Sequence, residues 1–103
     1  MSGPVFHLLG LGQRAGKVVS GDFAVRGHLA KGKVKLLIIA TNTSERIKGE
    51  YIRIGQSKKV TTRVAFTKDQ LGLALGKSPR ATVAILDPNF ARGIEGLLEG
   101  GEA

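Results

Sequence analysis

The chain has 103 residues, of which 16 are basic and 8 are acidic, so its formal net charge is +8. This length suits one domain, residues 1–103, and a 42% share of hydrophobic residues is too high for a disordered chain. The absence of cysteine excludes disulfides, thiolate metal sites and cysteine nucleophiles, and it fits a reducing cytoplasm. No apolar run approaches the roughly 20 residues of a membrane span. We therefore expect a soluble, unprocessed, cytoplasmic protein.

The positive charge is unevenly distributed along the chain. Residues 1–80 contain 15 basic and 4 acidic side chains, whereas residues 81–103 contain 1 basic and 4 acidic side chains. A basic body on a small domain is typical of nucleic-acid binding, and a merely solubilising surface is the alternative. Aromatic residues make up only 5% and are scattered, which disfavours a sheet of base-stacking aromatics. If RNA is the partner, recognition should depend on phosphates, helix termini and shape.

Helix and strand signals alternate along the chain. The first helix is expected from about Pro4 to Gly16, with its apolar residues facing inward; these are Val5, Leu8, Leu9 and Leu11. The other predicted elements are helices at 22–31, 45–56, 68–75 and 88–98 and strands at 17–20, 36–40, 62–66 and 81–86. Four strands interleaved with helices indicate an α/β sandwich, one sheet with helices on both faces. Residues 99–103 are expected to form a flexible tail.

Residues that favour helix N-termini precede or open three of these helices. Asp22 suits the positive end of the second helix, and Ser44 and Thr67 supply side-chain caps for the third and fourth. The run Leu36–Ala40 is apolar throughout, which is typical of a strand covered on both faces.

Two glycine-rich segments resemble nucleotide-binding loops: residues 10–15, and Gly76-Lys77-Ser78, which mimics the end of a Walker motif. The run Gly10–Ala15 matches a dinucleotide fingerprint, but it precedes a predicted strand instead of following one. The spacing from Gly72 to Gly76 is one residue too short for a Walker loop, and Pro79 lies where a helix should begin. Neither segment predicts a nucleotide site.

Side chains that support catalysis are scarce. His7 and His28 are the only imidazoles, and neither has a second ligand at metal-binding spacing. No serine lies in a nucleophile elbow, and the carboxylates are too few for a paired acid and base. We therefore predict no enzymatic activity, no metal, no cofactor and no small-molecule substrate.

The segment Ser20–Phe23 is the most promising binding feature. A glycine-bearing turn between a strand and a helix presents free backbone amides at the positive end of the helix, where a phosphate or an exposed base edge can bind. An ordinary connection capped by Asp22 is the alternative. Asp22 disfavours a phosphate directly on the turn, but its carboxylate suits a hydrogen bond from a guanine amine.

Several stretches of the chain resemble a known family. Residues 8–21 (LLGLGQRAGKVVSG), 32–40 (GKVKLLIIA), 66–77 (FTKDQLGLALGK) and the strand 81–86 are similar, in order and spacing, to the bacterial YlxQ-like proteins. These belong to the ribosomal protein L-seven-Ae superfamily, which binds kink-turn RNA. The resemblance covers about residues 5–98. It implies a three-layer αβα sandwich with a mixed four-stranded sheet.

The resemblance also implies where RNA is held. In this superfamily the turn and helix after the first strand grip the RNA, and the loop before the last strand helps. Here the turn is Ser20-Gly21-Asp22, the recognition helix starts at Phe23, and the second loop is Lys77-Ser78-Pro79-Arg80. Lys68 starts the adjacent helix.

The family's RNA-binding signature is glycine-x-asparagine-glutamate-x-x-lysine. Aligned from Gly21, its three polar positions hold Phe23, Ala24 and Gly27. Arg26 lies one residue from the lysine position, and one step along a helix turns a side chain by about 100°. If Phe23 is exposed it would stack on a splayed base; we favour a place in the core.

Together these observations predict a monomeric, non-catalytic RNA-binding protein. Its expected partner is a kink-turn or related structured RNA, in a ribosome or another ribonucleoprotein. The predicted RNA-binding residues are Arg14, Lys17, Ser20, Gly21, Asp22, Phe23, Arg26, Lys68, Lys77 and Arg80. The alternative is a protein-interaction module of the same fold that docks an acidic partner through this surface.

Overall fold

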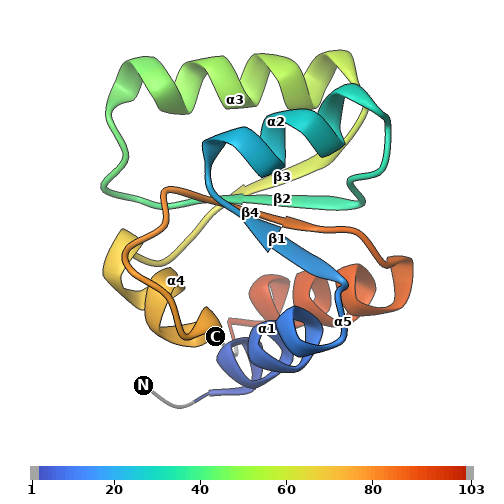
Figure 1. The fold of residues 1–103 in the computed structure, drawn as a ribbon, viewed down its shortest axis with the longest axis vertical. Coiled ribbons are helices and arrows are strands. Elements are labelled where there is room, and N and C mark those ends of the chain that lie inside the picture. The colour runs from blue at the N-terminus through green and yellow to red at the C-terminus, as the bar shows by residue number, and fades with distance from the viewer. Residues whose placement is uncertain (1–2, 102–103) are drawn as a thin grey trace.

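The computed structural model describes residues 3–101 as five helices and four strands (Figure 1). In chain order they are α1 (Pro4–Arg14), β1 (Val18–Ser20), α2 (Asp22–Ala30), β2 (Leu36–Ile39), α3 (Glu45–Ser57), β3 (Thr61–Val64), α4 (Lys68–Leu75), β4 (Thr82–Ile85) and α5 (Pro88–Glu99). Every predicted element is present, with ends shifted by a few residues at most. No helix among the described residues is long and apolar enough to cross a membrane.

The four strands form one mixed sheet in the order β1-β4-β2-β3. β4 is antiparallel to both β1 and β2, whereas β2 and β3 are parallel. Helices α2 and α3 cover one face of the sheet, and α1, α4 and α5 cover the other (Figure 1). The expected three-layer αβα sandwich with a mixed four-stranded sheet is confirmed.

The two central strands explain why both faces must be covered. Every residue of β2 and β4 is buried. Because successive side chains of a strand point to opposite faces, each central strand contributes to both cores. Leu36 and Ile38 pack toward α1, α4 and α5, while Leu37 and Ile39 pack toward α2 and α3.

The predicted helix caps are confirmed at two sites. The Ser44 side chain accepts a hydrogen bond from the Ile47 amide at 3.3 Å. Thr67 and Gln70 form a reciprocal capping box, in which each side chain accepts from the other residue's backbone amide. These contacts satisfy amides that have no partner within the helix, and they fix where α3 and α4 begin.

Three local expectations are wrong. Leu11 is 38% exposed and Phe6 takes the inward position on α1, where its ring lies edge-on to Phe66 at 4.8 Å. The third strand ends at Val64, because Phe66 adopts a left-handed φ of 65° that leaves the sheet. Helix α5 extends to Glu99, one residue into the predicted tail; Glu102 and Ala103 lie outside the described residues.

The loop between α4 and β4 folds back tightly over its own helix. A Cβ added to Gly72 would lie 2.4 Å from the Ser78 carbonyl oxygen and 2.9 Å from that of Lys77. Only glycine permits this approach, so Gly72 fixes the path of the loop that leads to Arg80.

We therefore predict that Gly72→Ala lowers the free energy of unfolding by about 1–3 kcal/mol, because the 77–78 backbone must move. Gly96→Ala on α5 is the matched control, since nothing lies within 4 Å of its added Cβ. There the alanine should stabilise the helix by about 0.5–1 kcal/mol. Urea denaturation of both variants measures the difference, and equal effects at the two sites would contradict the assigned role of Gly72.

Candidate nucleic-acid interface

The turn after β1 and the loop before β4 lie against each other. Ser20 is paired with Val83 across the antiparallel ladder, and the Gly21 amide donates to the Thr82 carbonyl at 3.2 Å. The Arg80 side chain closes the contact, because its Nε donates to Ser20 Oγ at 3.1 Å. Two segments 60 residues apart in sequence therefore form one surface.

An open hollow of about 280 Å³ lies between these segments. Its walls come from α1, β1, α2 and the loop; they are Gln13, Val18, Val19, Ser20, Ala24, Lys77 and Arg80. The residues exposed there are both polar and apolar, and two are cationic. This composition suits a ligand with an anionic group and a flat apolar part, as a nucleotide has.

Arg80 is held in place from several sides. Its Nη1 donates to Ser78 Oγ at 2.8 Å, and its backbone amide donates to the Lys68 carbonyl at 3.1 Å. The Lys68 amide in turn donates to Asn42 Oδ1 at 2.9 Å. These bonds hold Arg80 against the backbone of Lys68, and the exposed Lys77 lines the hollow with Arg80.

The Gly21 turn differs in detail from the expectation. Its φ of 90° and ψ of 154° belong to the region that glycine alone adopts readily. Its amide is engaged with Thr82 and is not the free donor that was predicted. Within residues 3–101, the amides of Asp22, Phe23 and Ala24 have no acceptor, so the positive end of α2 is still available to a ligand.

Phe23 is 95% exposed, so the expectation that it belongs to the core is wrong. Helix α2 buries Val25 and Leu29, which are four residues apart and share one face. Phe23 precedes Val25 by two residues, or about 200° of rotation, so it lies on the opposite face. An aromatic ring therefore stands in solvent beside the turn.

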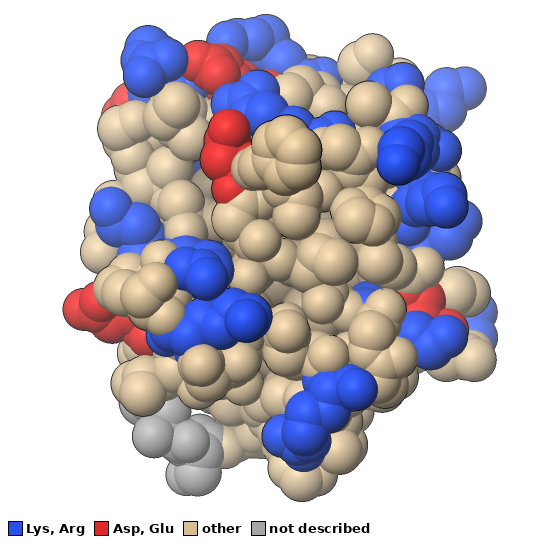
Figure 2. All heavy atoms as spheres, viewed as in Figure 1, with Lys and Arg blue, Asp and Glu red and all other residues tan. Residues whose placement is uncertain are grey.

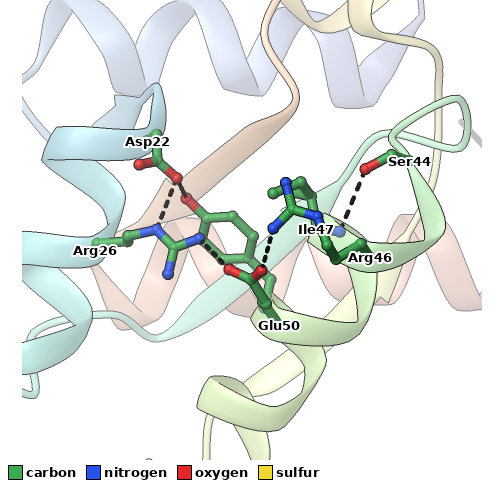
Figure 3. Close-up of polar contacts among 7 residues, drawn as sticks. Asp22, Arg26, Ser44, Arg46, Ile47 and Glu50 are labelled. Atoms are coloured by element: carbon green, nitrogen blue, oxygen red, sulfur yellow. Dashed lines mark hydrogen bonds and ion pairs between the residues drawn. The ribbon is translucent and has the colours of Figure 1, made fainter.

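Asp22 and Arg26 belong to a polar cluster that joins α2 to α3 (Figure 3). Asp22 Oδ1 accepts from the buried Tyr51 hydroxyl at 2.5 Å and from Arg26 Nε at 2.7 Å. Arg26 Nη2 also donates to Glu50 Oε1 at 2.9 Å, and its guanidinium lies 4.6 Å from the centre of the Tyr51 ring. Arg46 donates to the other oxygen of Glu50. We call Asp22, Arg26, Glu50 and Tyr51 the α2–α3 clasp.

The predicted cations are not all in one place. Arg26 is directed toward α3 and already has two carboxylate partners. Arg14 ends α1 next to Gln13, which lines the hollow, and its guanidinium lies near Gly10 and the last turn of α4. Lys17 precedes β1 and its carbonyl accepts from Leu86, so it lies at the far end of β1 from Ser20, about 10 Å away. We call the β1–α2 turn (20–24), the α4–β4 loop (76–81) and the adjoining Lys68 the turn surface. Its cations are Lys68, Lys77 and Arg80.

Known proteins share this arrangement of elements. Residues 5–94 match the model of the "Ribosomal protein L7Ae/L30e/S12e/Gadd45 family". The chain belongs to this family. It is 35% identical to "RNA-binding protein YlxQ" of Bacillus subtilis (strain 168), over 91% of this chain and 94% of that one. It is 29% identical to the protein of the same name from Enterococcus faecium, over 91% of this chain and 90% of that one.

Solved structures support the L7Ae-family assignment at the level of the fold. A Bacillus halodurans protein of unknown function superposes with a TM-score of 0.90 and 26% identity, covering 95% of this chain and 99% of that one. The "Giardia lamblia 15.5kD RNA binding protein" superposes with a TM-score of 0.76 and 22% identity, covering 93% and 85%. The sandwich and its element order are therefore those of the L7Ae family.

The clasp sets the protonation of its members in this L7Ae-family chain. Hydrogen bonds from Tyr51 and then from Arg26 lower the pKa of Asp22 below its ordinary value of 3.8. The Arg26 hydrogen bond lowers the pKa of Glu50 below its ordinary value of 4.5. Burial, and then the bond to Asp22, raise the pKa of Tyr51 to about 12. Both carboxylates are thus charged and the phenol remains a donor at neutral pH.

Among residues 3–101, no group of three or more His, Asp or Glu side chains is placed to hold a metal ion. His28 Nδ1 lies 2.8 Å from the Ala24 carbonyl within its own helix. The arrangement offers hydrogen-bond donors, cations and an exposed ring, which are the means of binding.

We predict that Tyr51→Phe lowers the free energy of unfolding by about 1 kcal/mol at neutral pH, because it removes one hydrogen bond and keeps the buried ring.

Asp22→Asn should lower the free energy of unfolding by about 0.2–1 kcal/mol, since the Asp22 side chain is 68% exposed and solvent screens its ion pair.

The loss in free energy of unfolding caused by Asp22→Asn should become smaller as the pH falls. The folded pKa of Asp22 is lowered, so its contribution is complete above its ordinary 3.8 and is lost as the pH falls through the lowered value. Denaturation curves of the wild type and the variant should therefore converge in acid. A stability difference that does not shrink at all as the pH falls below 3.8 would contradict the role of the carboxylate.

Proposed function

We propose that this chain binds a kinked, structured RNA through the joined surface of the β1–α2 turn and the α4–β4 loop. One observation supports this most strongly: in a chain of the L7Ae family, Arg80 of the loop bonds to Ser20 of the turn beside an exposed Phe23. The names of its relatives, RNA-binding protein YlxQ, support the same class of partner.

Each part of the surface has a separate role in this proposal. The free amides that open α2 donate to a phosphate or base edge, and Lys68, Lys77 and Arg80 contact the RNA backbone. Phe23 stacks on a base that the kink splays out of the helix, because its ring is almost completely in solvent.

Asp22 and Arg26 act as positioning residues. Their mutual bond and their contacts with Tyr51 and Glu50 fix the start of α2 against α3. With Phe23 and Ala24 at two polar positions of the family signature, recognition depends on shape, stacking and backbone contacts more than on hydrogen bonds to base edges.

The proposal extends to the setting of the protein. A non-catalytic, monomeric, cytoplasmic RNA-binding protein that joins a ribosome or another ribonucleoprotein agrees with the family assignment and with the surplus of positive charge. No element of the turn surface requires a second copy of the chain.

Binding to a kink-turn RNA and to a straight duplex of equal length, each across a salt series, tests the proposal. We expect the kinked RNA to bind at least tenfold more tightly, about 1.4 kcal/mol, at every salt concentration. Equal affinities would contradict kink recognition. Binding of an acidic protein segment, with neither RNA bound at low salt, would favour the protein-interaction alternative.

Phe23→Ala isolates the stacking contribution. We predict that it weakens kinked-RNA binding by about 1–3 kcal/mol while straight-duplex affinity and thermal stability stay unchanged. Leu73→Ala is the matched control, because Leu73 is 65% exposed on α4 and lies outside the proposed surface. If both variants bind the kinked RNA like the wild type, Phe23 does not stack on a base.

A further inference from the structure

A second cationic surface lies at the end of the molecule away from the turn. Helices α2 and α3 both end where β2 and β3 begin, since Leu36 is paired with Thr61 in the parallel ladder. The connections at this end contain five exposed lysines: Lys31, Lys33, Lys35, Lys58 and Lys59. We call them the lysine end. Figure 2 shows Lys and Arg side chains gathered at this side of the molecule, on the right of the view, and again near the loop before β4 on the left.

No ion pair neutralises the lysine end among the described residues. Asp87 follows β4 at the same end of the sheet, but its Oδ2 accepts from the Asn89 and Phe90 amides and caps α5. Residues 23–44 and 51–68 contain no acidic side chain. The ion pairs found among the described residues involve Arg26, Arg46, Lys48 and Arg63, and none involves the lysine end. Cations do stabilise helix C-termini, but only Lys58 donates there, to the Ala30 carbonyl at 3.5 Å. The other four lysines need a different explanation.

Lys59 has an unusual backbone for its residue type. Its φ of 58° is in the left-handed region, directly after α3. Glycine or asparagine is favoured at this position of a helix end, because a Cβ clashes with the following carbonyl oxygen. The chain therefore has a cation at a position that backbone geometry alone would give to glycine.

The surface chemistry favours an RNA backbone over other anionic partners. The large exposed hydrophobic side chains of residues 3–101 are Leu11, Phe23, Val64 and Leu73, and none is at the lysine end. A membrane surface or a protein interface would need such anchors. Ammonium groups on flexible stems, without apolar neighbours, match the regularly spaced phosphates of a duplex.

We propose that the lysine end binds the phosphate backbone of a second RNA duplex, so that the molecule bridges two RNA segments. The path along β2 from Lys35 to Thr41 separates the two surfaces by about 20 Å, and they lie at opposite ends of the sheet. This site is independent of the turn surface and does not rest on kink recognition.

Two charge-matched triple variants test the proposal on the full-length chain. One is Lys33→Gln/Lys35→Gln/Lys59→Gln at the lysine end, and the other is Lys68→Gln/Lys77→Gln/Arg80→Gln at the turn surface. The probe is a straight RNA duplex, titrated across a salt series. We expect the lysine-end triple to weaken duplex binding at least tenfold and to lower the log–log salt slope by about 0.9 for each phosphate contact that is lost. The turn-surface triple variant should change the duplex affinity and the salt slope by much less.

The outcomes separate this site from the proposed function. Equal losses in the two variants, or a larger loss in the turn triple, would overturn a dedicated second site. A competition experiment gives a further test. If polyglutamate displaces the duplex as effectively as competitor RNA of equal charge does, the proposal is overturned, because the partner would then be an acidic protein. The turn surface is tested separately by the ratio of kinked-RNA affinity to straight-duplex affinity at the turn. The lysine-end triple variant should leave kink recognition by the turn surface intact.

Lys59→Gly keeps the test valid if the triple variant folds poorly. Glycine suits the left-handed backbone, so the melting temperature should not fall, while duplex affinity should drop severalfold. Unchanged duplex affinity in a stable Lys59→Gly protein would argue against a phosphate contact at this residue.

Discussion

The central place of β4 in the sheet is the constraint on which the candidate interface depends. Because β4 lies between β1 and β2 and runs antiparallel to both, its first residue meets the end of β1. The loop that precedes β4 must then lie beside the turn that follows β1, and the Gly21 amide bonds to Thr82 at this point. The bond between Arg80 and Ser20 follows from this strand order.

The opposite end of the same sheet has a different composition. There the ends of α2 and α3 meet the starts of β2 and β3, and the connections consist largely of lysine. At the turn end, by contrast, cations lie among hydrogen-bonded loops and an exposed ring. The sheet, with both central strands buried, lies between the two ends.

Most of the fold was predictable from the sequence because local signals and tertiary packing agree. The apolar run 36–40, the Thr67 cap and the proline at the start of α5 each indicate one structure, which the tertiary fold retains. Phe66 was missed because a left-handed φ in a phenylalanine has no sequence signal; its ring packs on Phe6 instead of continuing β3.

The site was predictable only in part. The exposure of Phe23 could have been predicted from the sequence, since the spacing of Val25 and Leu29 already defines the buried face of α2. The partners of Asp22 and Arg26 were not, because Tyr51 and Glu50 lie on α3 and only the packing of two helices joins them. Lys17 was grouped with the turn by its closeness in sequence, although β1 extends between them.

An amide NMR titration with kink-turn RNA distinguishes a single joined interface from two separate ones, because it reports on every part of the surface at once. We expect the largest chemical-shift changes in two separate segments, residues 20–24 and 76–81, and we expect both to saturate at the same RNA concentration. Shifts confined to one of these segments, or centred on α1 and α5, would contradict a single interface built from the turn and the loop.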